Sequence, residues 1–225
     1  MMRAAAILAT IARGDTHMPR DPEPPPERQD APLEHELAAL LRDQQYDQLA
    51  TRALEAYSDG LYGYLISLMK NPMDAAEVFS QAVEDFWRGL PRFRGEARVQ
   101  TWLYKLAQHA ACRFRRSPWN RGDRTSDSKI DDLVAAYSHT APWRDTEVKD
   151  HIRTLRDDLD PDDRALLILR VDRDLGWKDV ALVMLEHDQP TAAAIDREAA
   201  RLRKRFEHVK KQLRARVATA GLVDP

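Results

Sequence analysis

Apolar residues recur at every third or fourth position over two long stretches of this chain, residues 33–116 and 148–217. The first stretch opens with a stripe made of Leu33, Leu37, Leu40 and Leu41. Such spacing predicts amphipathic helices, because about 3.6 residues complete one helical turn and place these side chains on one face. The pattern breaks at NPMD, residues 71–74, where a new helix is expected to start.

The composition favours the same fold class. The chain has 225 residues with only 8 glycines and 7% aromatic residues, while the strong helix formers Ala, Leu, Arg and Glu are frequent. A chain of this length can form one large core or two small ones. We therefore predict an all-α protein with two small helical domains.

Two segments lack helical periodicity, one before the first domain and one between the two domains. Residues 1–32 include the charged, Pro-rich run PRDPEPPPERQDAP and are predicted to be a disordered extension. Residues 117–146 are polar with several helix breakers and are predicted to be a linker. The two domains are then expected over residues 33–116 and 147–220. No apolar run approaches the roughly 18 residues that span a membrane.

Several kinds of site are missing from the sequence. There is no Gly-rich phosphate loop, and the 7 histidines and single Cys112 lack metal-ligand spacing. The aspartates around Asp160-Pro161 lie where a helix should start, so capping and the helix dipole explain them. We expect no enzyme activity, no metal and no cofactor. One cysteine also allows no internal disulfide, which favours a cytoplasmic location.

The helix predicted over residues 74–90 has two unlike faces. Asp74 is the expected N-cap, with Glu77 completing a capping box. The inner face is predicted to hold Phe79, Val83, Phe86 and Leu90. The opposite face presents a polar stripe of Glu77, Gln81, Glu84 and Arg88.

The next helix, TWLYKLAQHAACRFRR, begins aromatic and ends basic, with Thr101 as its expected N-cap. One face carries Trp102, Lys105, His109, Arg113 and Arg116, and the preceding loop adds Arg92, Arg94 and Arg98. Cations neutralise phosphates, and an exposed aromatic ring can stack on an unpaired base. The pattern therefore indicates binding to single-stranded or melted nucleic acid. The alternative is a solvated face with Trp102 packed inward.

The last helix supplies a second basic surface. Its candidate nucleic-acid contacts are Arg197, Arg201, Arg203, Lys204 and Arg205. A short helix and a break precede it, which is the outline of a helix-turn-helix that reads a major groove. The alternative is an ordinary basic C-terminal helix, which is common in proteins of many functions.

Residues 74–116 resemble the second conserved region of bacterial RNA polymerase sigma factors of the sigma-70 family, most closely the small extracytoplasmic-function (ECF) group. The resemblance rests on Ala76, Glu77, Gln81, Phe86, Trp87, Leu90, Phe93, Thr101, Trp102, Leu103, Tyr104, Ala107 and Arg116. The unit from Val148 resembles the fourth region more weakly, through residues 166–171, 179–181 and 200–205.

The resemblance implies a role for each surface. The Glu77 stripe would dock on the clamp helices of the largest polymerase subunit. The loop from Arg94 to Gln100 and the Trp102 stripe would capture a flipped base of the non-template strand at the proximal promoter element. The C-terminal helix-turn-helix, with the five residues of the last helix named above, would read the distal element as duplex.

Three positions depart from the family pattern as the resemblance aligns them. Val78 stands where the family usually has an acid, and His109 where it usually has Asn. The run EHDQPTAAAID is longer than the usual tight turn, and its alanines, residues 192–194, offer few donors to base edges.

The resemblance implies that the partners are core RNA polymerase and promoter DNA, with an anti-sigma factor as a further candidate and no membrane contact. Two other functions stay open at this point. One is a stand-alone helix-turn-helix regulator that binds duplex DNA, although such a protein needs neither the Glu77 stripe nor the TWLY element. The other is a helical interaction protein whose basic faces only make it soluble.

Overall fold

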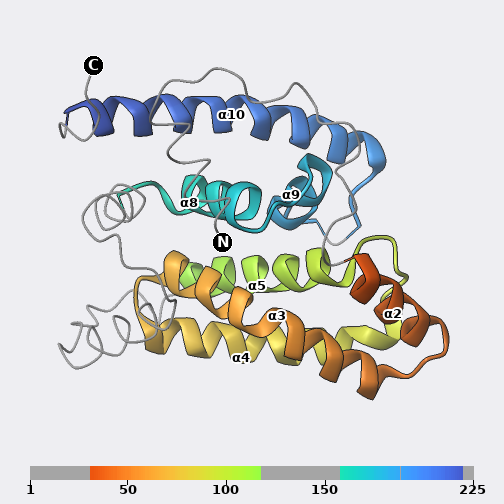
Figure 1. Cartoon of the computed structure of the whole chain (residues 1–225). Coiled ribbons are helices and arrows are strands. Elements are labelled where there is room, and N and C mark those ends of the chain that lie inside the picture. The colour runs from red at the N-terminus through yellow and green to blue at the C-terminus, as the bar shows by residue number, and fades with distance from the viewer. Residues whose placement is uncertain (1–30, 118–157, 188, 220–225) are drawn as a thin grey trace. The chain divides into compact units, whose positions relative to one another are not determined.

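The computed structural model describes residues 31–117, 158–187 and 189–219, and all regular elements in these ranges are helical (Figure 1). The first helical unit contains α2 (Ala31–Arg42), α3 (Tyr46–Met69), α4 (Pro72–Gly89), the 3₁₀ turn η1 (Leu90–Arg92) and α5 (Val99–Arg116). The second helical unit contains α8 (Pro161–Leu167), the π-helical turn η3 (Ile168–Asp172), most of α9 (Trp177–Met184) and α10 (Ala192–Thr219). The predicted all-α class is confirmed. Residues 1–30 of the predicted extension and 118–146 of the linker lie outside the described residues, while residues 31 and 32 belong to α2. The domain boundaries therefore stay predictions.

A turn divides the first predicted stretch into α2 and α3. Its residue Gln44 has a left-handed φ of 57°, and the Gln44 N–H donates to the carbonyl of Leu41 at 3.1 Å. The local sequence DQQ contains neither Gly nor Pro, so the two strongest turn signals are missing and only Asp43 favours a turn. The sequence pattern therefore predicts a helix that continues through this turn.

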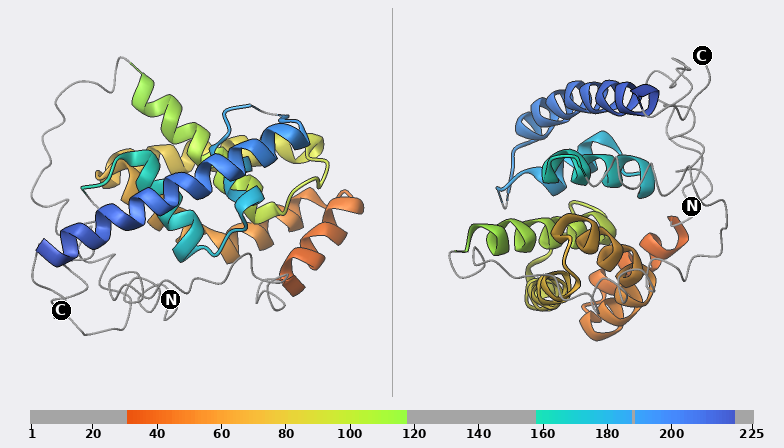
Figure 2. Two further views of the ribbon diagram at one scale, coloured as in Figure 1. Left: turned by 90° about the horizontal axis from the view of Figure 1, so that it is seen from above. Right: turned by 90° about the vertical axis from the view of Figure 1, so that its left-hand side faces the viewer.

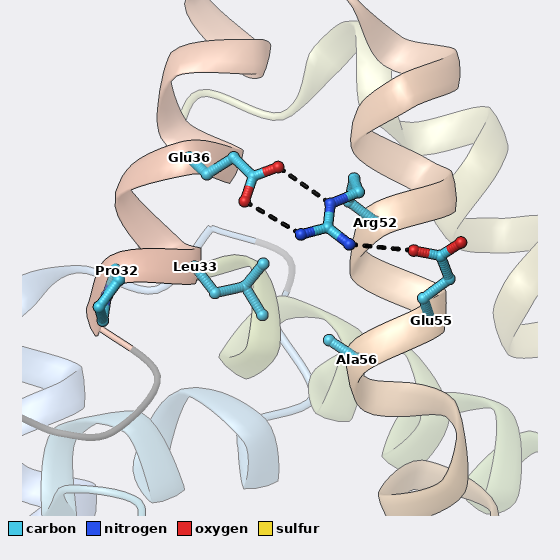
Figure 3. A pocket seen from close by; sticks show the side chains of 6 residues that line it. All are labelled: Pro32, Leu33, Glu36, Arg52, Glu55 and Ala56. Atoms are coloured by element: carbon cyan, nitrogen blue, oxygen red, sulfur yellow. Dashed lines mark hydrogen bonds and ion pairs between the residues drawn. The ribbon is translucent and has the colours of Figure 1, made fainter.

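An arginine joins α2 to α3 along a shallow groove (Figure 3). The Arg52 guanidinium donates to Glu36 of α2 at 2.9 Å and to Glu55 of α3 at 3.1 Å. The bond from Arg52 holds the pKa of the Glu36 carboxyl below its usual range. Pro32, Leu33 and Ala56 complete the lining of this groove. All three charged groups are exposed, so the contribution of these pairs to stability is small.

Helix α4 begins earlier than the sequence pattern predicts. Asn71, rather than Asp74, is the N-cap, and its side chain accepts bonds from the N–H groups of Met73 at 2.9 Å and Asp74 at 3.3 Å. Asn71 has extended backbone angles, as expected of a residue before proline, and Pro72 occupies the first helical position. The prediction of a capping box at Asp74 is therefore wrong.

The buried face of α4 is also rotated from its prediction. Ala75, Val78, Ala82 and Phe86 are buried, and Leu90 follows them in η1. Phe79 and Val83 are only half-buried, and the ring of Phe79 contacts Tyr62 edge-on. α4 packs against both α3 and α5. Small alanines suit this double contact because they let neighbouring helices approach closely.

The second helical unit has a core of its own. Leu166, Leu169, Val180, Leu202 and Phe206 are all fully or almost fully buried. Asp160 caps α8 by accepting a bond from the Asp162 N–H at 3.0 Å, which confirms the predicted helix start. α10 packs on α8 and is one unbroken helix in both views of Figure 2.

Candidate protein and nucleic-acid interfaces

The outward face of α4 carries the polar stripe that the sequence predicts. Glu77, Gln81, Glu84 and Arg88 are all exposed. Arg88 pairs with Glu84 one turn away, and Gln81 Nε2 donates to Asp85 Oδ1 at 3.1 Å. These bonds stay within α4, so the stripe remains open to a binding partner. Its role in docking stays a prediction.

Two large apolar side chains lie on the same outward face. Met73 is 63% exposed and Trp87 is 50% exposed, one near each end of α4. Buried aromatic anchors surrounded by polar groups are typical of the centre of protein interfaces. By contrast, Val78 is only 1% exposed. Its departure from the family pattern therefore concerns the core and not this face.

Trp102, the predicted stacking residue, is half-buried in an aromatic cluster. Its ring stacks on Phe93 with centroids 4.2 Å apart and planes 3° from parallel, and it meets Phe86 at 5.0 Å. Gly89 leaves the space for this ring, since a Cβ there would lie 2.7 Å from Trp102 Cζ2. Trp102 is thus packed inward, as the alternative interpretation expected. The stack also fixes the start of the basic loop, because Phe93 precedes Arg94.

The remaining residues of the α5 stripe differ in exposure and pairing. Arg113 is exposed, but its guanidinium donates to Asp85 of α4. Lys105 and His109 are half-buried, and Arg116 is exposed near the end of the helix. In the preceding loop, Arg94 is exposed and lies 3.8 Å from Glu96, and Arg98 is half-buried. The structure therefore brings these cations together on one helix and its entry loop, while nucleic-acid binding by them stays a prediction.

A carboxylate far away in the sequence holds the start of α5. Glu34 of α2 accepts bonds from the backbone N–H of Val99 at 2.9 Å and of Gln100 at 3.0 Å, and from the Tyr57 hydroxyl at 2.8 Å. The predicted N-cap, Thr101, instead lies buried inside the helix at 1% exposure. Sequence patterns identify caps only among near neighbours. They could not have found a cap supplied from another helix.

The five basic residues predicted on α10 have separate roles. Arg205 donates to Asp163 and lies 3.3 Å from Asp160, so it ties α10 to the start of α8. Arg201 pairs with Glu198 at 2.6 Å, which raises the pKa of the Arg201 guanidinium. Arg203 lies over the Trp177 ring, 5.8 Å from its centroid. Arg197 and Lys204 are exposed, and no ion pair to either is seen among the described residues.

Other kinds of site find no support in the described parts of the chain. No group of three or more His, Cys, Asp or Glu side chains there is arranged to hold a metal ion. Cys112 accepts a bond from Arg115 at 3.3 Å and is half-buried. Within the same ranges, no helix has the length and apolar character needed to cross a bilayer.

Comparisons with known proteins agree with this geometry. Residues 53–121 match the family model of sigma-70 region 2, which covers most of α3 and all of α4 and α5. The chain is also 28% identical over 141 residues to the RNA polymerase sigma-H factor of Pseudomonas aeruginosa, an alignment that covers 57% of this chain and 70% of that protein. The resemblance of α4 and α5 to the second conserved region of sigma factors is thereby confirmed. The chain contains a match to sigma-70 region 2 and is similar to an RNA polymerase sigma factor.

Proposed function

We propose that this protein is a transcription initiation factor that binds core RNA polymerase and directs it to specific promoters. The observation that carries the proposal is the match of residues 53–121 to sigma-70 region 2. Within this range, α3, α4 and α5 pack together, and α4, with its exposed polar face, packs directly against the basic helix α5. A single rigid unit can therefore hold a protein partner and a nucleic acid at once. The resemblance of residues 74–116 favours the ECF type.

We place the polymerase contact on the outward face of α4. Glu77, Gln81, Glu84 and Arg88 offer polar groups along it, and Trp87 adds a half-exposed aromatic ring. The bonds of Gln81, Glu84 and Arg88 seen among the described residues stay within α4, so a partner can cover this face without breaking contacts to other helices. Neither a stand-alone DNA-binding regulator nor a passive helical protein requires such a face.

We place the proximal promoter contact on α5 and its entry loop. Arg94, Arg98, Lys105, Arg113 and Arg116 are the cations of this surface, with Arg113 paired to Asp85, and His109 adds an imidazole group. Base stacking is worth roughly 1–3 kcal/mol per base in single-strand binding. Capture of unpaired bases could therefore drive melting without hydrolysis of a nucleotide. Since one ring face of Trp102 is covered by Phe93, Trp102 contributes chiefly by fixing the shape of the loop.

We place the distal promoter contact on α10, with α9 as the preceding helix of a helix-turn-helix. Ala192, Ala193 and Ala194 start α10, and their side chains have no donor for base edges. Arg197 and Lys204 are exposed and suit phosphate oxygens. We therefore expect phosphate contacts to dominate at the distal element. A scan of base substitutions in that element should change binding affinity only weakly. Strong effects of single bases would contradict the expectation that phosphate contacts dominate.

Binding to core polymerase tests the proposal most directly. The full chain should bind bacterial core RNA polymerase tightly, and Glu77→Lys and Gln81→Ala should each weaken binding by about tenfold or more, a typical effect at the centre of an interface. Asp59→Lys and Gln48→Ala are matched controls, because they change exposed residues of α3 in the same way. Both controls should bind as the unchanged chain does. If the unchanged chain does not bind, the stand-alone helix-turn-helix regulator becomes the better explanation.

A further inference from the structure

Asp85 lies between the two proposed binding surfaces and bonds to a residue of each. Its Oδ1 accepts from Gln81 Nε2 on α4 at 3.1 Å, and its Oδ2 accepts from Arg113 Nη2 on α5. The Asp85 side chain is 24% exposed, while that of Arg113 is 57% exposed. Asp85 is therefore the better buried partner. Gln81 orients the Asp85 carboxylate so that its Oδ2 atom faces α5.

A carboxylate and a nucleic-acid phosphate compete for the same guanidinium. Both are oxygen anions that accept forked bonds from arginine, so Arg113 cannot bind both fully at once. While Asp85 holds Arg113, this arginine adds little positive charge to the α5 stripe. A phosphate at this position must first displace the carboxylate, and the exchange replaces one ion pair by another with little net gain.

We infer that Asp85 masks Arg113 and thereby weakens the binding of single-stranded nucleic acid to α5 in the free protein. The inference rests on the proposed function, since it concerns the same α5 surface. Asp85 is a positioning residue here, because it acts on nucleic acid only through Arg113. The Asp85–Arg113 ion pair reduces the binding of stray single strands to α5. A promoter strand that is held by the other contacts of α5 can still displace the carboxylate.

A second pair in the same unit provides a matched comparison. Glu36 of α2 binds Arg52 of α3 as Asp85 of α4 binds Arg113 of α5. Changing either acid to its amide removes one negative charge and loosens one arginine. Only the Asp85 change does so on the α5 stripe, so the two variants separate a local effect from a general change in net charge.

The test measures binding of the full chain to a labelled single-stranded DNA oligonucleotide of mixed sequence over a series of salt concentrations. Asp85→Asn should bind several-fold more tightly at low salt, and its plot of log K against log salt should be steeper by about 0.7, the value for one added phosphate contact on a single strand. Glu36→Gln should match the unchanged chain. Thermal unfolding of each variant checks that it is folded.

A double-mutant cycle makes the result specific to Arg113. Asp85→Asn should give its full gain only when Arg113 is present, so the gain should be much smaller when the change is made in an Arg113→Gln chain. Equal gains from Asp85→Asn and Glu36→Gln, or no gain from Asp85→Asn, would overturn the inference. Core polymerase binding by the same variants is read separately. If it is retained while the gain is missing, the inference fails and the proposed function stands.

Discussion

Individual arginines show how far a basic sequence differs from a basic surface. Arg113, Arg201 and Arg205 each bind a carboxylate of the same chain. Arg205 is held by the aspartates at the start of α8, which the sequence pattern explained by capping and the helix dipole. Each arginine that is neutralised internally contributes less to nucleic-acid binding than its position on the helix suggests. Exposure and pairing therefore have to be known residue by residue.

The carboxylate of Glu34 should contribute clearly to the stability of the first helical unit. Glu34→Ala leaves the Val99 and Gln100 N–H groups without their acceptor, and loss of a helix cap costs about 1–2 kcal/mol. Urea unfolding should show this loss, with a smaller one for Glu34→Gln, which keeps one acceptor oxygen. The exposed neighbour His35 provides the control, since His35→Ala should leave the midpoint unchanged.

The left-handed residue Gln44 should be improved by glycine. An L side chain at a φ of 57° is strained, whereas glycine adopts this angle freely. Gln44→Gly should therefore raise the free energy of unfolding by about 0.5–1 kcal/mol. Gln45→Gly is the control, because Gln45 has a φ of −84° and gains nothing from glycine. A destabilised Gln44→Gly protein would show that the Gln44 side chain matters more than its backbone angle.

At the scale of the helices, the ends of α4 and α5 are set by contacts that local sequence shows only in part. Asn71 and Pro72 start α4 through a local cap. α5 begins at Val99, with Glu34 of α2 bound to its first N–H groups, so its start depends on another helix. Gly89 at the end of α4 makes room for Trp102 of α5. Two of these three features are therefore tertiary.

Gly89 should be intolerant of even a methyl group. Its backbone is ordinary right-handed helix, so the sensitivity comes from the Trp102 ring, which would lie 2.7 Å from an added Cβ, and not from strain. Gly89→Ala should lower the free energy of unfolding by about 1–3 kcal/mol, as overpacking does. Chemical denaturation measures this. Part of the loss should be recovered when Trp102→Phe is added, because the smaller ring leaves space for the methyl group.

Arg205 should stabilise the contact between α10 and α8. Arg205→Ala leaves Asp160, Asp162 and Asp163 close together without their cation. We expect a loss of about 1–2 kcal/mol, seen as faster amide hydrogen exchange in both helices. Arg205→Lys should recover only part of it, because an ammonium group cannot fork between carboxylates. Arg197→Ala should change nothing, which distinguishes the ion pairs from general charge.

At the scale of the whole molecule, two helical units each have their own buried core. Phe86 is 0% exposed in the first unit and Phe206 is 1% exposed in the second. Units with separate cores can unfold separately.

A core substitution should accordingly affect only its own unit. Phe86→Ala should lower the stability of α2 to α5 by about 3–5 kcal/mol, the usual cost of removing a buried ring. Hydrogen exchange should then rise across these helices and stay unchanged in α8 and α10. Equal acceleration in both units would mean that they fold as one cooperative structure.

The sequence by itself determined the helical class, the approximate helices and the outward polar face of α4, because helical periodicity and local capping act over a few neighbouring residues. Its motifs also identified the region that matches sigma-70 region 2. Only the tertiary structure decided that Trp102 packs inward and that Asp85 holds Arg113. It also decided that Glu34 caps α5 and that Arg205 binds the start of α8. The last three contacts join residues that are 28, 65 and 42 positions apart. Periodicity shows which face of a helix a side chain occupies, whereas its partner on another helix depends on how the helices pack.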